Sequence, residues 1–176
     1  MRHAIAYRNA ARPSSTLRLA GFAVLGSLAL AASAQVALPF WPVPATLQSL
    51  VVLLLGALGG SRLGVASVVL YLAQGSLGLP VFAAGTAGPA VLAGPTAGYL
   101  LGFLPAAALA GLAGRGWARQ ALVLAAAHLV LFVPGVAWLA GFVGWERALA
   151  AGFVLFLPAT LVKTGLAFAV LRAVRR

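Results

Sequence analysis

A chain of 176 residues that is 63% hydrophobic and only 7% charged is far more apolar than a soluble domain, in which roughly half of the residues are apolar. Together with a mean hydropathy of +1.08, this composition excludes a soluble globular protein and predicts an integral membrane protein. The absence of cysteine excludes a disulfide framework and a thiolate metal site, and the net charge of +11 raises the question of a nucleic-acid partner.

Apolar segments follow one another along the chain, separated by glycine, proline or arginine, at about 17–38, 46–60, 63–78, 96–114, 118–140 and 148–171. Since a bilayer core of about 30 Å needs roughly 20 apolar residues per helix, the chain has room for about six spans and little else. We therefore predict an all-α integral membrane protein with six transmembrane helices. We expect residues 1–16 to form a basic cytoplasmic tail and residues 17–176 to form a single membrane domain.

Two stretches leave the number of spans open. The segments 46–60 and 63–78 are only about 22–24 Å long as helices, so "GGSRLG" between them is either a cytoplasmic turn or the tip of a re-entrant hairpin. The run "LALAASAQ" at 28–35 imitates a signal-peptide cleavage site, and cleavage after Ala34 would leave five spans. We favour two short spans and an uncleaved first helix.

Arginines at alternate junctions between the apolar segments predict the orientation of the protein. They are Arg2, Arg8, Arg12 and Arg18 before the first segment, Arg62, Arg115 and Arg119 at later junctions, and Arg172, Arg175 and Arg176 after the last segment. The opposite junctions hold only Arg147, beside the single acidic residue Glu146. By the positive-inside rule both termini are cytoplasmic, in a multi-pass protein of the inner (plasma) membrane. The net positive charge then sets the orientation of the protein in the membrane and attracts anionic lipid. We therefore expect membrane lipid and no nucleic acid as a partner.

The stretch "GLPVFAAGTAGPAVLAGPTAGY" at 78–99 is the most irregular part of the chain, with five glycines, three prolines and no charge. A backbone this broken cannot face lipid, because its unpaired N–H and C=O groups need partners. Transporters place their substrates beside such broken segments. We expect an outer lid loop at about 79–95, and an ordinary connection between helices is the alternative.

Three stretches, in this order and at these separations, carry a family resemblance: "WPVPATLQSLVVLLLGALGG", "GLPVFAAGTAGPAVLAGPTAGYLLGF" and "FLPATLVKTGLAF". From about residue 17 to its end the chain closely resembles the BioY family, the biotin-specific substrate-binding (S) components of energy-coupling-factor (ECF) transporters. The resemblance implies a six-helix membrane protein that binds biotin near the outer face and delivers it to the cytoplasm. It also implies docking on a transmembrane coupling subunit that is driven by paired ATPase subunits.

The residues agree with a transport function in which energy comes from a partner. The chain has no G-x-x-x-x-G-K-[ST] phosphate loop, so it does not hydrolyse ATP by that route. It also has no Ser/His/Asp set, metal cluster or pair of carboxylates, so we expect no enzyme and no cofactor, with biotin as the transported ligand. The alternative is a channel or facilitator for a different small solute, which the scarcity of charge permits.

Lys163, the only lysine, lies within the last apolar segment. A charge at the middle of a membrane helix costs about 2.5 kcal/mol or more, so its ammonium needs a partner, a water molecule or a path along which the side chain reaches the membrane surface. It either extends toward the cytoplasmic end of its helix or lies in a polar pocket opened where Pro158 breaks that helix. We favour ligand contact, because the chain has no intramembrane carboxylate and the biotin valerate carboxylate is a natural counter-charge.

The resemblance is imperfect at the expected site. Family members commonly read Pro-Gly-Asp-x-x-Lys, with the Asp accepting from the ureido N–H groups, whereas this chain has Thr160 at the Asp position. Thr86 similarly stands where the outer loop of the family often has Asn or Ser. A threonine hydroxyl is uncharged and shorter than a carboxylate. Either the ligand is held more weakly, or other groups complete the site, or the ligand is not biotin, and biotin is our interpretation.

The remaining candidate binding residues each have a structural alternative. Gln48 and Gln74 are amides that can reach a ureido group or bridge helices. Tyr99 can pack on the bicyclic ring, reach the carboxylate or anchor the chain at the interface. Phe82 and Trp41 are expected as lid aromatics, with interfacial anchoring as the alternative.

Three further candidates lie on the first helix, and one on the fifth. Ala23, Ser27 and Ala31 recur every four residues and make a face of small side chains. This face either packs internally or docks on the coupling subunit, as the resemblance implies. We expect His128, alone in its helix, to satisfy a neighbouring group rather than to shuttle protons.

Overall fold

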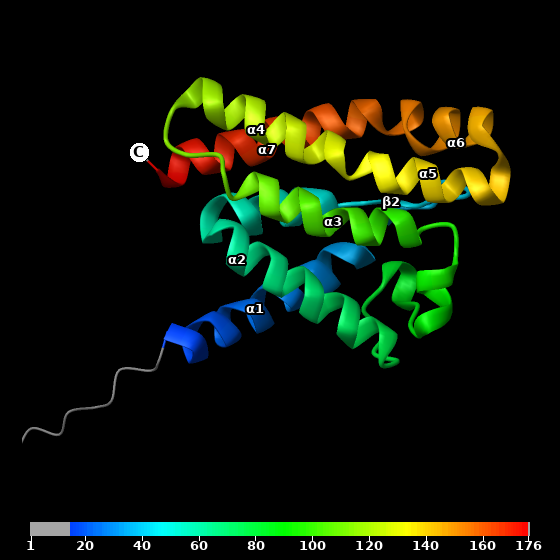
Figure 1. The fold of residues 1–176 in the computed structure, drawn as a ribbon, viewed down its shortest axis with the longest axis horizontal. Coiled ribbons are helices and arrows are strands. Elements are labelled where there is room, and N and C mark those ends of the chain that lie inside the picture. The colour runs from blue at the N-terminus through cyan, green and yellow to red at the C-terminus, as the bar shows by residue number, and fades with distance from the viewer. Residues whose placement is uncertain (1–14, 176) are drawn as a thin grey trace, which may run out of the picture.

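The computed structural model describes residues 15–175, which form a bundle of helices (Figure 1). In chain order its elements are α1 (Ser15–Gln35), β1 (Ala37–Leu38), β2 (Ala45–Thr46), α2 (Gln48–Ser76), η1 (Ala83–Gly85), η2 (Pro89–Ala93), α3 (Ala97–Ala110), α4 (Trp117–Val130), α5 (Phe132–Val143), α6 (Trp145–Gly152), η3 (Val154–Phe156) and α7 (Leu157–Val174). Most of the expected basic tail, residues 1–14, lies outside the described residues. Its last two residues, Ser15 and Thr16, already belong to α1.

The all-α prediction is confirmed for the described residues, apart from one short ladder. The strands β1 and β2 pair antiparallel over two residues each, Ala37 with Thr46 and Leu38 with Ala45. Helical stretches long and apolar enough to cross a membrane are Ser15–Gln35, Gln48–Ser76, Trp117–Val143 and Trp145–Val174. The helix α3, at 14 residues, is also apolar but shorter.

The helix α2 consists of two arms that meet at Gly60. The backbone of Gly60 has φ of 82° and ψ of 166°, which glycine adopts without a Cβ penalty and which interrupts the helix. The junction is tied to α3, since Ser61 Oγ donates to the carbonyl oxygen of Ala108 at 2.6 Å. The predicted apolar segments 46–60 and 63–78 therefore fall on the two arms, which both run from the kink toward the opposite end of the molecule (Figure 1).

The helix α3 lies at the centre of the bundle, packed on both α2 and α5. A Cβ built on Gly98 would lie 2.3 Å from the carbonyl oxygen of Pro134, so nothing larger than hydrogen fits between the two backbones there. Close approach of this kind is what small residues provide in membrane helix bundles. The N-terminal half of α3 is held in this way against α5, where it forms a wall of the cavities described below.

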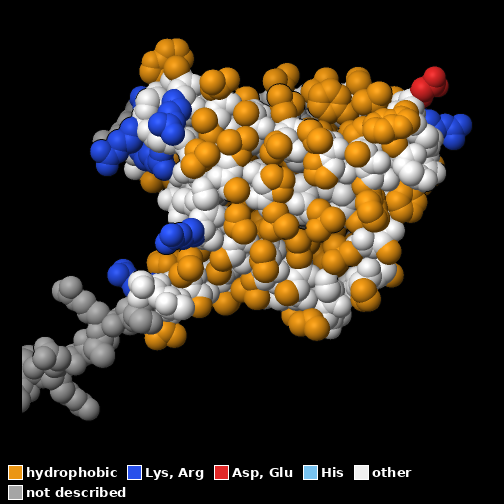
Figure 2. Space-filling model, in the orientation of Figure 1, with side chains coloured by type: hydrophobic (Ala, Val, Ile, Leu, Met, Phe, Trp, Pro, Cys, Tyr) orange, Lys and Arg blue, Asp and Glu red, His pale blue; other side chains and the backbone are white. Residues whose placement is uncertain are grey.

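Charged side chains lie at opposite ends of the molecule (Figure 2). Most of the blue side chains gather at the end where α1 begins and α7 ends, whereas the one acidic residue, Glu146, lies at the other end with a single blue side chain beside it. Between the two ends the surface is largely apolar, with exposed Leu25, Leu122 and Val133 among others. The folded chain therefore separates the arginine-bearing junctions from the other junctions, as the sequence pattern predicts.

The first helix is an integral part of this fold. Leu30 and Ala34 of α1 are fully buried, so cleavage after Ala34 would remove residues that the core contains. Ala23 and Ser27 are buried as well, and Ala31 is partly buried against the core. The expected small-residue face thus packs internally in this structure, and neither Ala23 nor Ser27 presents a free surface to a partner subunit.

Candidate functional site

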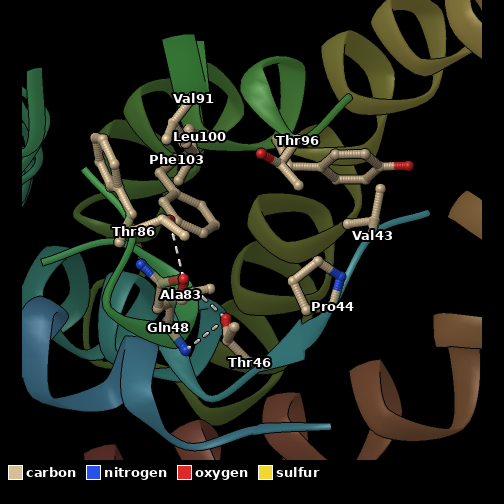
Figure 3. A pocket seen from close by; sticks show the side chains of 12 residues that line it. Val43, Pro44, Thr46, Gln48, Ala83, Thr86, Val91, Thr96, Leu100 and Phe103 are labelled. Atoms are coloured by element: carbon tan, nitrogen blue, oxygen red, sulfur yellow. Dashed lines mark hydrogen bonds between the residues drawn. The ribbon is translucent and has the colours of Figure 1, made fainter. Parts of the chain in front are cut away.

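The larger of two adjoining cavities lies between the segment 43–48, the irregular segment 82–96 and the start of α3. Its volume is about 250 Å³, and its lining residues are Val43, Pro44, Thr46, Gln48, Phe82, Ala83, Thr86, Val91, Thr96, Tyr99, Leu100 and Phe103. The labelled side chains come from segments far apart in the sequence and surround a common space (Figure 3). Most of the wall is apolar, with threonine hydroxyls and one amide as the polar groups.

A chain of hydrogen bonds fixes the polar side of this cavity. Thr46 Oγ1 donates to Gln48 Oε1 at 3.0 Å, and Gln48 Nε2 donates to the hydroxyl of Tyr71 at 2.7 Å. The Tyr71 hydroxyl then donates to the carbonyl oxygen of Val81 at 3.2 Å. These bonds connect both arms of α2 to the loop that follows it, so Gln48 is held in one orientation beside the cavity.

The expected lid loop at 79–95 supplies the opposite wall. Phe82 is almost completely buried and packs edge-to-face on Tyr71, with 5.4 Å between ring centroids. The backbone N–H of Phe82 donates to the carbonyl oxygen of Thr86 at 3.1 Å, and Thr86 Oγ1 donates to the carbonyl oxygen of Ala83 at 2.9 Å. The loop is therefore ordered by its own hydrogen bonds and by a buried aromatic side chain.

The smaller cavity, of about 50 Å³, shares Val43, Pro44, Thr46, Tyr99 and Phe103 with the larger one. Its other lining residues are Ser49, His128, Leu131, Phe132, Phe156, Thr160 and Lys163. Five shared wall residues make the two cavities adjoining compartments of one site. The larger compartment reaches the loop, and the smaller one reaches α4, α5 and α7.

Lys163 reaches the smaller compartment from α7 and is 9% exposed. Its Nζ donates to the carbonyl oxygen of Thr46 at 2.8 Å and to Ser49 Oγ at 3.1 Å. An ammonium group has three N–H donors, so one donor remains for another partner. The single acidic residue of the chain, Glu146, lies at one end of the molecule, and no carboxylate lines either compartment within the described residues.

Two further predicted residues lie beside Lys163. Thr160, one turn earlier on α7, is buried and lines the same compartment. Tyr99 lines both compartments and is oriented by its hydroxyl, which donates to the carbonyl oxygen of Gly152 at 2.9 Å. The Tyr99 hydroxyl is thus engaged by α6, and the ring is the part that faces the compartments.

Of the predicted binding residues, the structure brings six together: Gln48, Phe82, Thr86, Tyr99, Thr160 and Lys163. The other two line neither compartment. Trp41 is 79% exposed on the segment between β1 and β2. Gln74 lies on the second arm of α2, and its Oε1 is buried without a hydrogen-bond partner in the described part of the chain.

Residues that were not predicted as binding residues also line the compartments, notably Thr46, Ser49, Phe103 and His128. Thr46 and Ser49 are polar residues at the start of an apolar segment, inside a stretch that carries the family resemblance, so their polarity was an available signal. Phe103 offered none, because an aromatic residue in an apolar helix is typical of packing or lipid contact.

Comparisons with known proteins show which family has a similar sequence. The model of the BioY family matches residues 7–176. "Probable biotin transporter BioY" of Pyrococcus horikoshii is 41% identical over 134 residues, which cover 76% of this chain and 82% of that protein. "Biotin transporter BioY2" of Lactococcus lactis is 35% identical over 150 residues, which cover 79% of this chain and 80% of that protein.

A solved structure shows the same fold. The crystal structure of the S-component for biotin from an ECF-type ABC transporter superposes with a TM-score of 0.81, at 22% identity, over 93% of this chain and 94% of that chain. The fold therefore agrees with that of an S component, and the family match covers nearly the whole sequence. This chain belongs to the BioY family.

Proposed function

We propose that this chain is the high-affinity S component of an ECF-type vitamin transporter, which binds biotin near the outer face of the inner (plasma) membrane and delivers it to the cytoplasm. Its family, the names of its relatives and its likeness to the S-component fold support this function. The same relatives are transporters rather than enzymes, and they do not favour a channel or facilitator for another solute.

The proposal rests on one observation. The two adjoining compartments have mostly apolar walls, and the smaller one is lined by the buried ammonium of Lys163, which has one N–H not used in its two hydrogen bonds. Biotin has matching parts, since a urea group and a carboxylate lie at the two ends of an apolar ring and chain. Small-molecule sites are typically apolar cavities with a few fixed polar groups that orient the ligand. Gln48, Thr86, Thr160 and Lys163 are the polar groups that we propose for biotin.

Lys163 is the only cation that lines either compartment within the described residues. We expect its third N–H to donate to an oxygen atom of the ligand, because a buried donor without a partner is costly. The sequence favours the carboxylate as that oxygen, and the ureido carbonyl is the other oxygen that biotin offers.

We also infer that the protein spans the membrane six times, with both termini in the cytoplasm. The helix α1, the two arms of α2, α3, the continuous pair α4 and α5, and the pair α6 and α7 supply six transmembrane segments. The arginine-rich end would face the cytoplasm by the positive-inside rule. A coupling subunit and ATPase subunits would bind there or along the membrane, since this chain has no phosphate loop of its own.

Uptake of labelled biotin tests this function in cells that lack their own biotin uptake. We expect cells that express this chain with the coupling module to take up biotin saturably, and excess unlabelled biotin to suppress the uptake while an unrelated vitamin does not. Inactivating the ATPase subunits distinguishes biotin uptake that is driven by ATP hydrolysis from uptake by this chain alone. Uptake that rises linearly with concentration, with no competition by biotin, would contradict the S-component function and favour a facilitator.

A further inference from the structure

The smaller compartment contains a buried side chain that the proposed function does not yet use, His128. Its ring is 1% exposed and stacks on Phe132, with 6.4 Å between ring centroids and 16° between ring planes. It lines the same compartment as Thr160 and Lys163, although it comes from α4 and they come from α7. His128 is therefore placed where it can meet the same part of a ligand as Lys163.

The hydrogen bonds around Thr164 decide which ring nitrogen of His128 carries the proton. Thr164 Oγ1 lies 2.7 Å from the carbonyl oxygen of Thr160 and 2.7 Å from His128 Nδ1. A hydroxyl has one proton and a carbonyl has none, so the Thr164 proton is used on Thr160. The second hydrogen bond must then be donated by Nδ1 of His128. In the neutral imidazole this leaves Nε2 as an unprotonated acceptor.

The residues that line the compartment consequently include both a hydrogen-bond donor and a hydrogen-bond acceptor. Lys163 has one N–H left after its bonds to Thr46 and Ser49, and His128 Nε2 has no hydrogen-bond partner within residues 15–175. The hydroxyl of Thr160, which can donate or accept, lines the same space. A carboxylate has no proton to give the acceptor, whereas a urea has N–H groups directly beside its carbonyl oxygen. A donor on Lys163 and an acceptor on His128 are therefore complementary to the carbonyl oxygen and an N–H of a urea.

We propose that Nε2 of His128 accepts a hydrogen bond from a ureido N–H of biotin in the smaller compartment. The ureido group lies there as the family resemblance implies, with Lys163 donating to its carbonyl oxygen. This inference rests on the proposed function and deepens it. His128 supplies an acceptor in a site where Thr160 supplies no carboxylate. The valerate chain then extends into the larger compartment, and the carboxylate does not meet Lys163.

Ligand analogues test both contacts in equilibrium binding to the purified protein. His128→Ala should weaken biotin binding roughly tenfold, the loss expected for one buried hydrogen bond. Methylating the ureido nitrogen that faces His128 should weaken binding to the wild type but add little in His128→Ala, because both changes remove the same bond. Biotin methyl ester should bind nearly as well as biotin. The proposal would be overturned if the affinity losses from His128→Ala and from ureido methylation multiplied when the two changes were combined. Failure of biotin methyl ester to bind would also overturn it.

Nitrogen-15 NMR of labelled histidine provides a second readout, which reports directly which ring nitrogen carries the proton. The chain has only two histidines, and His3→Gln assigns the signals of His128. We expect Nδ1 of His128 to be protonated and Nε2 to be unprotonated in the free protein, and we expect the Nε2 signal to shift when biotin binds. Thr164→Val removes the acceptor of Nδ1 and should change the tautomer population, while Thr164→Ser should preserve it.

The outcomes separate the two proposals. Wild-type protein that binds biotin tightly while its Nε2 signal stays unchanged overturns the role of His128 and leaves the S-component function standing. A protonated Nε2 in the free protein has the same consequence. Wild-type protein that does not bind biotin at all overturns the proposed function and, with it, the role of His128.

Discussion

Lys163 draws its hydrogen-bond partners from a distant part of the chain. Thr46 in β2 and Ser49 in the first turn of α2 lie more than 110 positions earlier, and the ammonium connects α7 to both of these elements. The group is thereby held in place inside an apolar bundle before any ligand arrives. Removing it should affect ligand binding more than folding, because both partners can bond elsewhere or face the cavity.

We predict that Lys163→Met weakens biotin binding about tenfold to a hundredfold, as expected for the loss of a hydrogen bond from a charged donor. Methionine keeps the apolar stem of lysine, which limits the change in packing. Arg62→Met is the matched control, because it removes a cation from an exposed position at the junction of the two arms of α2. Equal affinities of Lys163→Met and wild type would show that the ammonium does not contact biotin.

The position of Lys163 beside a cavity is predictable from the sequence, since it is the only lysine and lies among apolar residues without a carboxylate. Its partners are not predictable, because the register between α7 and α2 depends on packing that no local pattern encodes. The same holds for His128. The sequence predicts that its ring forms a hydrogen bond with a neighbouring group, and the structure identifies that neighbour as Thr164, which lies 2.7 Å from Nδ1.

At the scale of elements, the cavity depends on how closely α3 approaches α5. The missing side chain of Gly98 allows the backbone of α3 to lie against the carbonyl of Pro134. Two residues that follow it on α3, Tyr99 and Phe103, line both compartments. Separating the two helices would therefore move one wall of the site.

We predict that Gly98→Ala destabilises the protein by about 1–3 kcal/mol, because the new methyl group would overlap the backbone of α5. It should also weaken biotin binding. Gly141→Ala is the matched control, since a Cβ at that position of α5 meets no atom within 4 Å. The thermal unfolding midpoint in detergent, measured beside biotin affinity, checks both. Similar midpoints for the two variants would contradict the close approach.

The element boundaries were predicted with uneven success, for physical reasons. The break between 46–60 and 63–78 was predicted from glycines and Arg62, and it occurs at Gly60, where the backbone requires a positive φ. The short ladder between β1 and β2 was not predicted, because two paired residues on each side carry no detectable alternation. Trp41 lies beyond this ladder and is exposed, so local sequence did not reveal which way its ring faces.

At the scale of the whole molecule, the separation of charges predicts the orientation in the membrane. Most arginine side chains lie at one end, and the other end holds Glu146 with a single basic side chain beside it (Figure 2). Since cytoplasmic loops carry the excess of arginine, the end with the α3–α4 turn would face the cytoplasm and the end with Glu146 would face outward.

The absence of cysteine makes this orientation directly testable. Single cysteines introduced as Glu146→Cys and Arg119→Cys should differ in their reaction with a membrane-impermeant thiol reagent. We expect the cysteine at 146 to react in intact cells and the cysteine at 119 to react only after the inner membrane is opened. The opposite pattern would invert the proposed topology, and the cysteine-free parent chain measures the background.

The central claim is that this chain alone forms a biotin site between α2, α3, α7 and the loop 79–95. Equilibrium binding of labelled biotin to the detergent-purified wild-type protein, without any partner subunit, tests it most directly. We predict saturable, high-affinity binding of one biotin per chain, which unlabelled biotin displaces. An active, correctly folded preparation that shows no saturable biotin binding would contradict the claim and leave only the fold and the family in place.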